Sequence, residues 1–184
     1  IHSLALTQDG FVYAWGKGQF GRLGQGSSDV ANKNTPVKVK GVGGSGFLSN
    51  IIKIAAGGYH NIVLASDGKM YTWGYNGYGN LGDGTQTQRE TPVEVSYSGD
   101  AVSNISCGFA HTAFTTTTGK VYCFGHGPNG QIGNNANNTN TLYPTQVVGV
   151  GNVGTLAGIR DVTCGDSFTH AIKDSDGSVY GWGK

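Results

Sequence analysis

Histidine is the residue of this chain best suited to acid–base or metal chemistry, and four of its five histidines recur along the sequence. His2, His60, His111 and His170 are expected to share one position of a repeated pattern. A catalytic histidine usually occurs once, so a histidine in every repeat indicates a structural role, here a hydrogen bond to the backbone beside a glycine turn. A metal site would need all four rings to converge to bonds of about 2.0–2.1 Å, which successive repeats that splay apart do not allow.

The sequence around the other candidate groups does not support phosphate binding, calcium binding or catalysis. The glycine-rich loops superficially look like loops that cradle phosphate, but no Lys-Ser/Thr pair follows them and none opens a helix. Asp29 and Asp83 lack a second carboxylate at the spacing of a calcium loop. His126 stands outside the histidine pattern and has no partner nearby in sequence. The sequence therefore predicts no catalytic residue, no cofactor and no metal ion, and hence no enzyme.

Three cysteines give an odd number. Cys107 and Cys164 occupy the position of Ala56 at the end of an expected first strand, and Cys123 lies on an expected third strand. First and third strands of one sheet lie about 9–10 Å apart, which is too far for a disulfide. We expect all three to be buried small residues; reactive or metal-bound thiols are the alternative.

The elements that must position these residues are copies of one unit. Trp15, Trp73 and Trp182 each precede a glycine, and Phe124 takes the same place once, at intervals of 58, 51 and 58 residues. A period of this length indicates repeats that are each too small to bury their own apolar face. Glycine makes up 33 of the 184 residues and recurs at fixed positions.

Each complete copy of the unit predicts four antiparallel strands. In the second copy the candidate strands cover residues 51–55, 60–64, 69–73 and 92–95. Asp67-Gly68 between the second and third strands is a strong hairpin signal, typical of a type I′ turn. Pro92 would begin the fourth strand, where its missing N–H costs least if that strand is a sheet edge. Four such strands describe a propeller blade.

The glycine-rich loop between the third and fourth strands is the most constrained segment. Leu23, Leu81 and Ile132 stand at one position within this loop and are expected to plug it into the core. Asn135 takes a place that glycine holds in the other copies. Because asparagine tolerates positive φ better than most residues, this exchange indicates a backbone reason for the glycines.

These motifs resemble the repeats of the regulator of chromosome condensation family. That repeat reads Ala-Gly-Gly-x-His, then Asp-Gly-x-Val-Tyr-x-Trp-Gly-x-Asn-x-x-Gly-Gln-Leu-Gly, and residues 56–60 and 67–82 follow it nearly position by position. The resemblance covers essentially the whole chain and implies an all-β, seven-bladed β-propeller. Fourteen candidate strands, grouped three, four, four and three, would supply about three to three and a half blades, as a fragment of a longer chain.

We expect one partial propeller over residues 1–184. The four copies fall at about residues 1–50, 51–100, 101–158 and 159–184, of which the first lacks its first strand and the last lacks its fourth.

The resemblance implies a non-enzymatic scaffold whose loops bind proteins. The candidate partner-binding residues are Phe20, Phe47, Leu48, Tyr75, Tyr78, His126 and Leu156. The net charge is +1 and no Lys/Arg cluster is present, so the electrostatic signal for nucleic-acid binding is missing. No apolar run of about 18 residues predicts a membrane span. The expected partners are an unidentified protein and the remaining blades of the same propeller.

Two alternative functions stay open. The family includes nucleotide exchange on a small GTPase, achieved through acidic and wedge-like elements that match no residue here. The other alternative is a secreted or surface-bound microbial binding or inhibitor protein. Two N-glycosylation sequons, which begin at Asn104 and Asn137, would matter only in a secreted protein.

Overall fold

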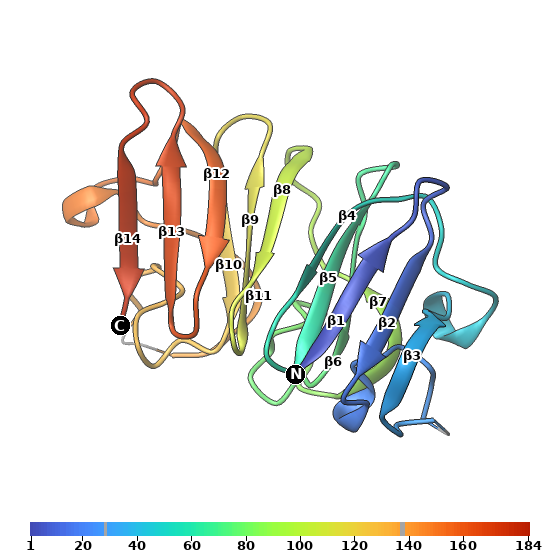
Figure 1. Ribbon diagram of the computed structural model, residues 1–184. Coiled ribbons are helices and arrows are strands. Elements are labelled where there is room, and N and C mark those ends of the chain that lie inside the picture. Colours follow the sequence, from blue (N-terminus) through green and yellow to red (C-terminus); the bar gives the residue numbers. More distant parts are fainter. Residues whose placement is uncertain (28, 137–138) are drawn as a thin grey trace.

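The computed structural model describes residues 1–27, 29–136 and 139–184 and is built almost entirely of β-strands (Figure 1). Within these residues the only helical elements are three short turns: η1 (Gln19–Gly21), η2 (Val42–Gly44) and η3 (Val150–Asn152). None of them is long enough to cross a membrane. Of the two sequons, Asn104 lies within a strand, and Asn137 lies outside the described residues.

Fourteen strands in the described part of the chain form four antiparallel sheets, as the sequence predicts. The first sheet contains β1 (His2–Leu6), β2 (Val12–Gly16) and β3 (Lys33–Lys38), and the second contains β4 (Ile51–Ala56), β5 (His60–Ala65), β6 (Met70–Gly74) and β7 (Arg89–Glu94). The third contains β8 (Val102–Cys107), β9 (His111–Thr116), β10 (Val121–Gly125) and β11 (Thr141–Gln146). The fourth contains β12 (Ile159–Cys164), β13 (Phe168–Lys173) and β14 (Val179–Gly183). Within each sheet, every strand pairs with the strand that follows it along the chain.

The hairpin between β5 and β6 is confirmed, but its turn is not of type I′. Gly68 has a φ of 87°, whereas Asp67 is not among the residues with positive φ. The N–H of Gly68 donates to the carbonyl of Ala65 at 3.0 Å, and Asp67 Oδ1 accepts from the N–H of Lys69 at 3.0 Å. A four-residue turn that ends in one left-handed glycine needs positive φ at that glycine alone.

The fourth strand begins earlier than the sequence predicts. β7 starts at Arg89, so Pro92 lies inside the strand rather than at its start. The ladder between β6 and β7 is irregular here, since Thr72 pairs with Val93 and Gly74 pairs with Arg89. β7 also forms the outer edge of its sheet. Proline is tolerated because edge strands and bulges leave backbone N–H groups out of the ladder.

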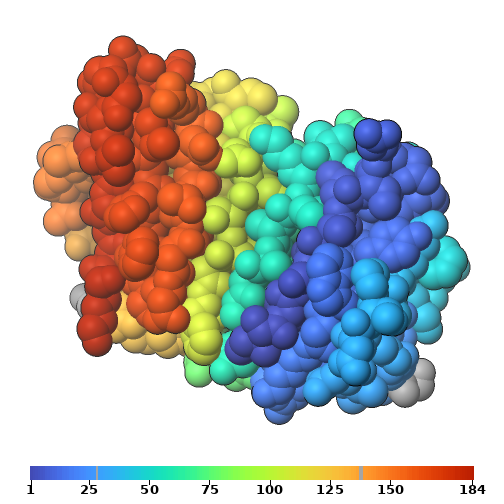
Figure 2. All heavy atoms as spheres, viewed as in Figure 1, coloured from blue at the N-terminus to red at the C-terminus, as the bar shows by residue number. Residues whose placement is uncertain are grey.

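The hydrophobic core lies between successive sheets. Figure 2 shows these sheets as consecutive bands of colour across the molecule. Leu23, Leu81 and Ile132 are at most 1% exposed, which confirms that they anchor their loops. Trp73 and Phe124 are fully buried, and Leu23 belongs to the same cluster of apolar side chains as Trp73. Each sheet therefore buries its apolar face against the loop of its predecessor.

Candidate functional site: an aromatic row beside the glycine loops

The recurring histidines occupy one structural position in three sheets but not in the fourth. His60 pairs with Gly74 in its ladder, and in the fourth sheet the residue that pairs with the matching Gly183 is Phe168. His170 lies two residues further along β13 and is exposed. The expectation that His170 shares the position of the other histidines is therefore wrong.

The buried histidines link neighbouring sheets. His60 Nε2 lies 2.7 Å from Thr112 Oγ1, and His111 Nε2 lies 2.9 Å from Thr169 Oγ1. Thr112 donates its hydroxyl hydrogen to the carbonyl of Asn80 at 2.9 Å. Since a hydroxyl has one hydrogen to give, His60 must donate from Nε2. The expected bond to nearby backbone is thus replaced by a bond to a side chain of the next sheet.

These histidines are neutral. Burial lowers the pKa of His60 to about 3 and that of His111 to about 4, because a buried imidazolium loses its hydration. His2 makes the equivalent bond to Asn61 Oδ1 at 2.6 Å, and burial lowers its pKa as well. In the part of the chain that the structure describes, no group of three or more His, Cys, Asp or Glu residues is placed to hold a metal ion.

The three cysteines are free thiols. Cys123 is fully buried, as expected, whereas Cys107 and Cys164 are only partly buried. Burial raises the pKa of all three thiols, that of Cys164 to about 12. A thiol with a raised pKa is a poor nucleophile at neutral pH, so these residues contribute packing.

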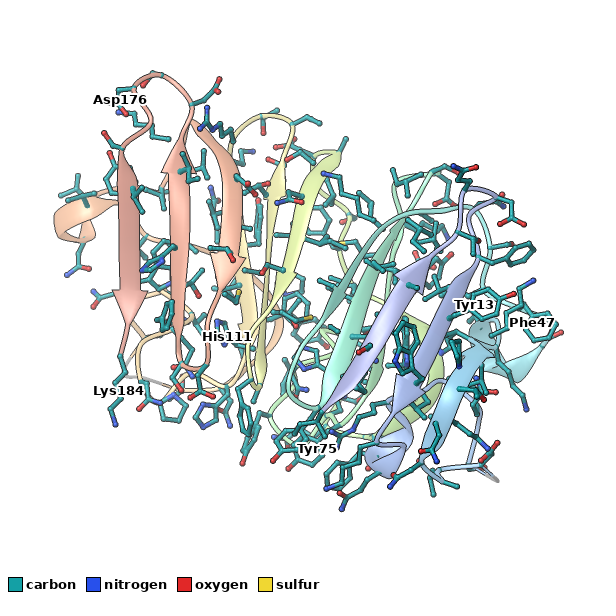
Figure 3. The ribbon with its side chains drawn as sticks, in the orientation of Figure 1. Tyr13, Phe47, Tyr75, His111, Asp176 and Lys184 are labelled. Atoms are coloured by element: carbon teal, nitrogen blue, oxygen red, sulfur yellow. The ribbon has the colours of Figure 1, made fainter. Side chains whose placement is uncertain are left out.

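Aromatic side chains gather at the glycine-loop ends of the sheets. We name this group the aromatic row; it consists of Phe109, Tyr59, Phe20, Tyr75, Tyr78 and His126. In this order, successive ring centroids are 4.7, 5.7, 5.1, 5.6 and 4.6 Å apart, which is the range of edge-to-face contacts. Figure 3 shows Tyr75 at the edge of the molecule opposite to Asp176. Four of the seven candidate binding residues therefore come together.

Repeated elements position the rings of the row. Tyr75 and His126 directly follow the glycines that end β6 and β10, so they hold equivalent places in two sheets. Phe20 lies in η1 with a φ of 66°, a left-handed backbone that is rare outside glycine. Phe109 is 41% exposed, and the other rings are half-buried against one another. The row is a partly exposed apolar surface.

The other three candidate residues lie elsewhere. Leu48 is 4% exposed and Leu156 is 7% exposed, so both anchor their loops in the core and are not available at the surface. Both leucines follow a short β-bridge at the same place in two copies, and such recurrence signals a core position. Phe47 is 55% exposed and lies away from Tyr75, at another edge of the molecule (Figure 3).

Arg22 lies behind the aromatic row, and the sequence alone did not indicate a role for it. Its side chain is fully buried. Its Cζ lies 5.0 Å from the ring centroid of Tyr59 and 5.5 Å from that of Phe20, the geometry of cation–π contacts. Arg22 takes the loop position that Asn80 and Gln131 hold in other copies. An arginine at an amide position was the signal that could have identified it.

The charge of Arg22 is only partly compensated. Nε donates to the carbonyl of Gln19 at 2.8 Å and Nη1 to that of Gly58 at 3.1 Å, whereas Nη2 has no partner among the described residues. Burial lowers the pKa of this guanidinium, while Tyr59 acts in the opposite direction. None of the ion pairs between described residues includes Arg22.

Solved structures of propeller proteins superpose on this arrangement of sheets. Human WBSCR16 superposes with a TM-score of 0.81 at 26% identity, covering 100% of this chain and 45% of that one. The Prp20p structure from Saccharomyces cerevisiae, described with its binding properties to Gsp1p and histones, gives 0.82 at 22% identity and covers 99% and 43%. At that identity, the likeness to Prp20p shows the fold alone.

Sequence comparisons extend over the whole chain. The ultraviolet-B receptor UVR8 of Arabidopsis thaliana is 35% identical over 99% of this chain and 39% of its own length. The probable E3 ubiquitin-protein ligase HERC4 of Homo sapiens is 33% identical over 99% of this chain and 16% of its own length. The chain thus spans well under half of these relatives. The model of the regulator of chromosome condensation (RCC1) repeat matches residues 9–64, 67–115 and 118–172. The chain therefore belongs to the RCC1 repeat family, as its repeated motifs indicate, and its sheets are propeller blades.

Proposed function

We propose that this chain is a non-enzymatic protein-interaction module and that the aromatic row is its contact surface. The observation that carries the proposal is the continuous contact of six rings from Phe109 to His126. Aromatic residues are enriched where proteins bind one another, because they bury a large area at a small cost in side-chain entropy. The RCC1 repeats support a scaffold role, since they form rigid blades that need little ordering on association.

The row has the physical properties of an anchor surface. Phe109 keeps 41% of its surface exposed, and its contact with Tyr59 holds the ring in one place. The rings are fixed by elements that the core anchors, namely the loop of Leu81 and the strand end at Gly74. A partner that packs on the exposed side of the row would therefore meet rings that are already in place.

Site-specific photo-crosslinking tests this function. A photoreactive phenylalanine replaces Phe109 in the full-length protein, within the cells that produce it, and a second protein carries the same group at Val153, which is 77% exposed. We expect discrete protein adducts through position 109, and we expect Tyr78→Ala to abolish them while Phe47→Ala does not. The purified partner should bind the Tyr78→Ala variant at least about 10-fold more weakly.

The crosslinking comparison can also contradict the proposal. Equal adducts through position 153, or adducts at 109 that persist unchanged in the Tyr78→Ala variant, would show that the row is not the contact surface. Thermal unfolding of both alanine variants serves as the control for loss of fold.

A further inference from the structure

Arg22 is the least compensated buried charge in the described part of the chain. Its guanidinium is fully buried, Nη2 has no hydrogen-bond partner, and no described carboxylate pairs with it. Buried charges are normally paired, because removing a charge from water is expensive. By contrast, Arg89 is paired with Asp83 at 2.9 Å. Arg22 therefore has no anionic partner among the described residues.

The surroundings of Arg22 favour one kind of anion. The guanidinium lies against the rings of Tyr59 and Phe20, so an approaching group must pass an aromatic surface. An arginine fork matches the geometry of a carboxylate. The ring of Phe20 stands on the turn between Gly18 and Arg22 and lies 5.5 Å from Cζ of Arg22. Because the guanidinium is fully buried, this ring has to move aside for an anion to enter.

We propose that Arg22 and the aromatic row form a docking site for a protein segment that presents a carboxylate beside an aromatic or apolar side chain. This inference rests on the proposed function, because it names the chemistry of the partner at the same surface. The carboxylate accepts from Nη2 of Arg22, and the neighbouring apolar group packs on the row. Charge complementarity supplies the specificity, and the rings supply the buried area.

Two small probes of the same shape test the carboxylate preference. Benzoate carries the ring and the anion, whereas benzamide carries the ring alone. The reporter is the indole N–H of Trp73, which donates to the backbone carbonyl of Arg22 at 3.0 Å. In nuclear magnetic resonance titrations of the ¹⁵N-labelled full-length protein, we expect benzoate to shift this signal with a dissociation constant at least about 10-fold lower than that of benzamide.

Variants identify the group responsible. Arg22→Gln, which restores the residue type of Gln131, should remove the preference for benzoate, and Arg22→Lys should weaken it. Arg160→Gln, at an exposed arginine of β12, is the matched control and should leave the titration unchanged. If Arg22→Gln fails to fold, the comparison of benzoate with benzamide on the unaltered protein still tests whether the site prefers a carboxylate.

The outcomes separate this inference from the proposed function. Equal shifts with both probes, or no shift with either, overturn carboxylate recognition even when crosslinking through position 109 persists. A preference for benzoate that survives in Arg22→Gln overturns the role of Arg22. Loss of the crosslinks would contradict the interaction surface itself.

Discussion

One glycine in each loop lies against the aromatic side chain of the following blade. A Cβ added to Gly82 would lie 2.7 Å from a ring carbon of Phe124, and one added to Gly133 would lie 2.8 Å from Nε1 of Trp182. These separations are shorter than van der Waals contact. The glycine therefore serves two purposes, since it permits positive φ and lets the next blade approach.

Two alanine substitutions separate these purposes. Gly82 and Gly43 both have a φ of 65°, but a Cβ at Gly43 would meet nothing within 4 Å. Gly43→Ala should therefore cost only backbone strain, about 1 kcal/mol. Gly82→Ala adds overpacking and should cost about 3 kcal/mol in the free energy of unfolding. Urea denaturation measures both, and equal losses would show that the contact with Phe124 is unimportant.

Single residues show where inference from the sequence stops. The positions of the glycines and of Leu23 were predictable, because recurrence reveals what the backbone and core require. Arg22 was not, because its burial depends on rings that other parts of the chain supply. The expectation for His170 was wrong because only the strand pairing shows that Phe168, two residues earlier, takes the position opposite the last glycine of β14.

At the scale of elements, one loop carbonyl per blade receives donors from the next blade. The carbonyl of Gln131 accepts from the indole N–H of Trp182 at 2.9 Å and from the hydroxyl of Thr169 at 3.0 Å. The carbonyl of Asn80 accepts from Thr112 at 2.9 Å but from no ring nitrogen, because Phe124 has none. The contact between the second and third blades therefore depends more on its threonine.

Replacing each threonine by valine tests this dependence. Both side chains are fully buried, and each accepts from a histidine of the preceding blade. Thr112→Val leaves the carbonyl of Asn80 without its side-chain donor and should cost about 2–3 kcal/mol. In Thr169→Val, the indole N–H of Trp182 still donates to the carbonyl of Gln131. This variant should therefore lose about 1 kcal/mol less unfolding free energy than Thr112→Val. Urea denaturation measures the loss of unfolding free energy in both variants. A larger loss for Thr169→Val would show that the contact between the second and third blades does not depend more on its threonine.

The strands were the most predictable elements, because alternating apolar residues and Asp-Gly turns are local signals. The start of β7 and the turn type at Gly68 were not predictable. Both depend on the ladder, where an irregular pairing admits Pro92 and a single left-handed glycine completes the hairpin. The histidine bonds that join the blades were hidden for the same reason, since they connect residues more than 50 positions apart.

At the scale of the whole molecule, contacts between successive copies hold the blades together. The division of the chain into copies at residues 1–50, 51–100, 101–158 and 159–184 stays a prediction. Stability is then distributed over nearest-neighbour interfaces. Each interface between described blades contains one histidine that bonds to the next blade, and His60 and His111 are fully buried whereas His2 is half-buried. A change that affects every interface at once should act on the entire propeller.

Acid is such a change. An unfolded histidine has a pKa of about 6.5, whereas His60 and His111 have pKa values of about 3 and about 4 in the folded protein. Between pH 6.5 and pH 4 the unfolded chain therefore binds protons that the folded chain excludes. Above pH 6.5 the two histidines do not reduce the free energy of unfolding. As the pH decreases below 6.5, this free energy should fall by up to about 1.4 kcal/mol per pH unit for each ring.

Variants of these histidines should change the slope of stability with pH. His60→Gln and His111→Gln each remove one titrating group. Between pH 6.5 and pH 4, each variant should therefore reduce the slope of the unfolding free energy against pH by up to about 1.4 kcal/mol per pH unit, the contribution of one proton. Urea denaturation of the full-length protein at several pH values measures the slope. The loss at pH 7.5, where both rings are neutral, isolates the cost of the altered hydrogen bond. If the double variant lost stability with acid as steeply as the unaltered protein, the neutral histidines would not be what makes the propeller sensitive to acid.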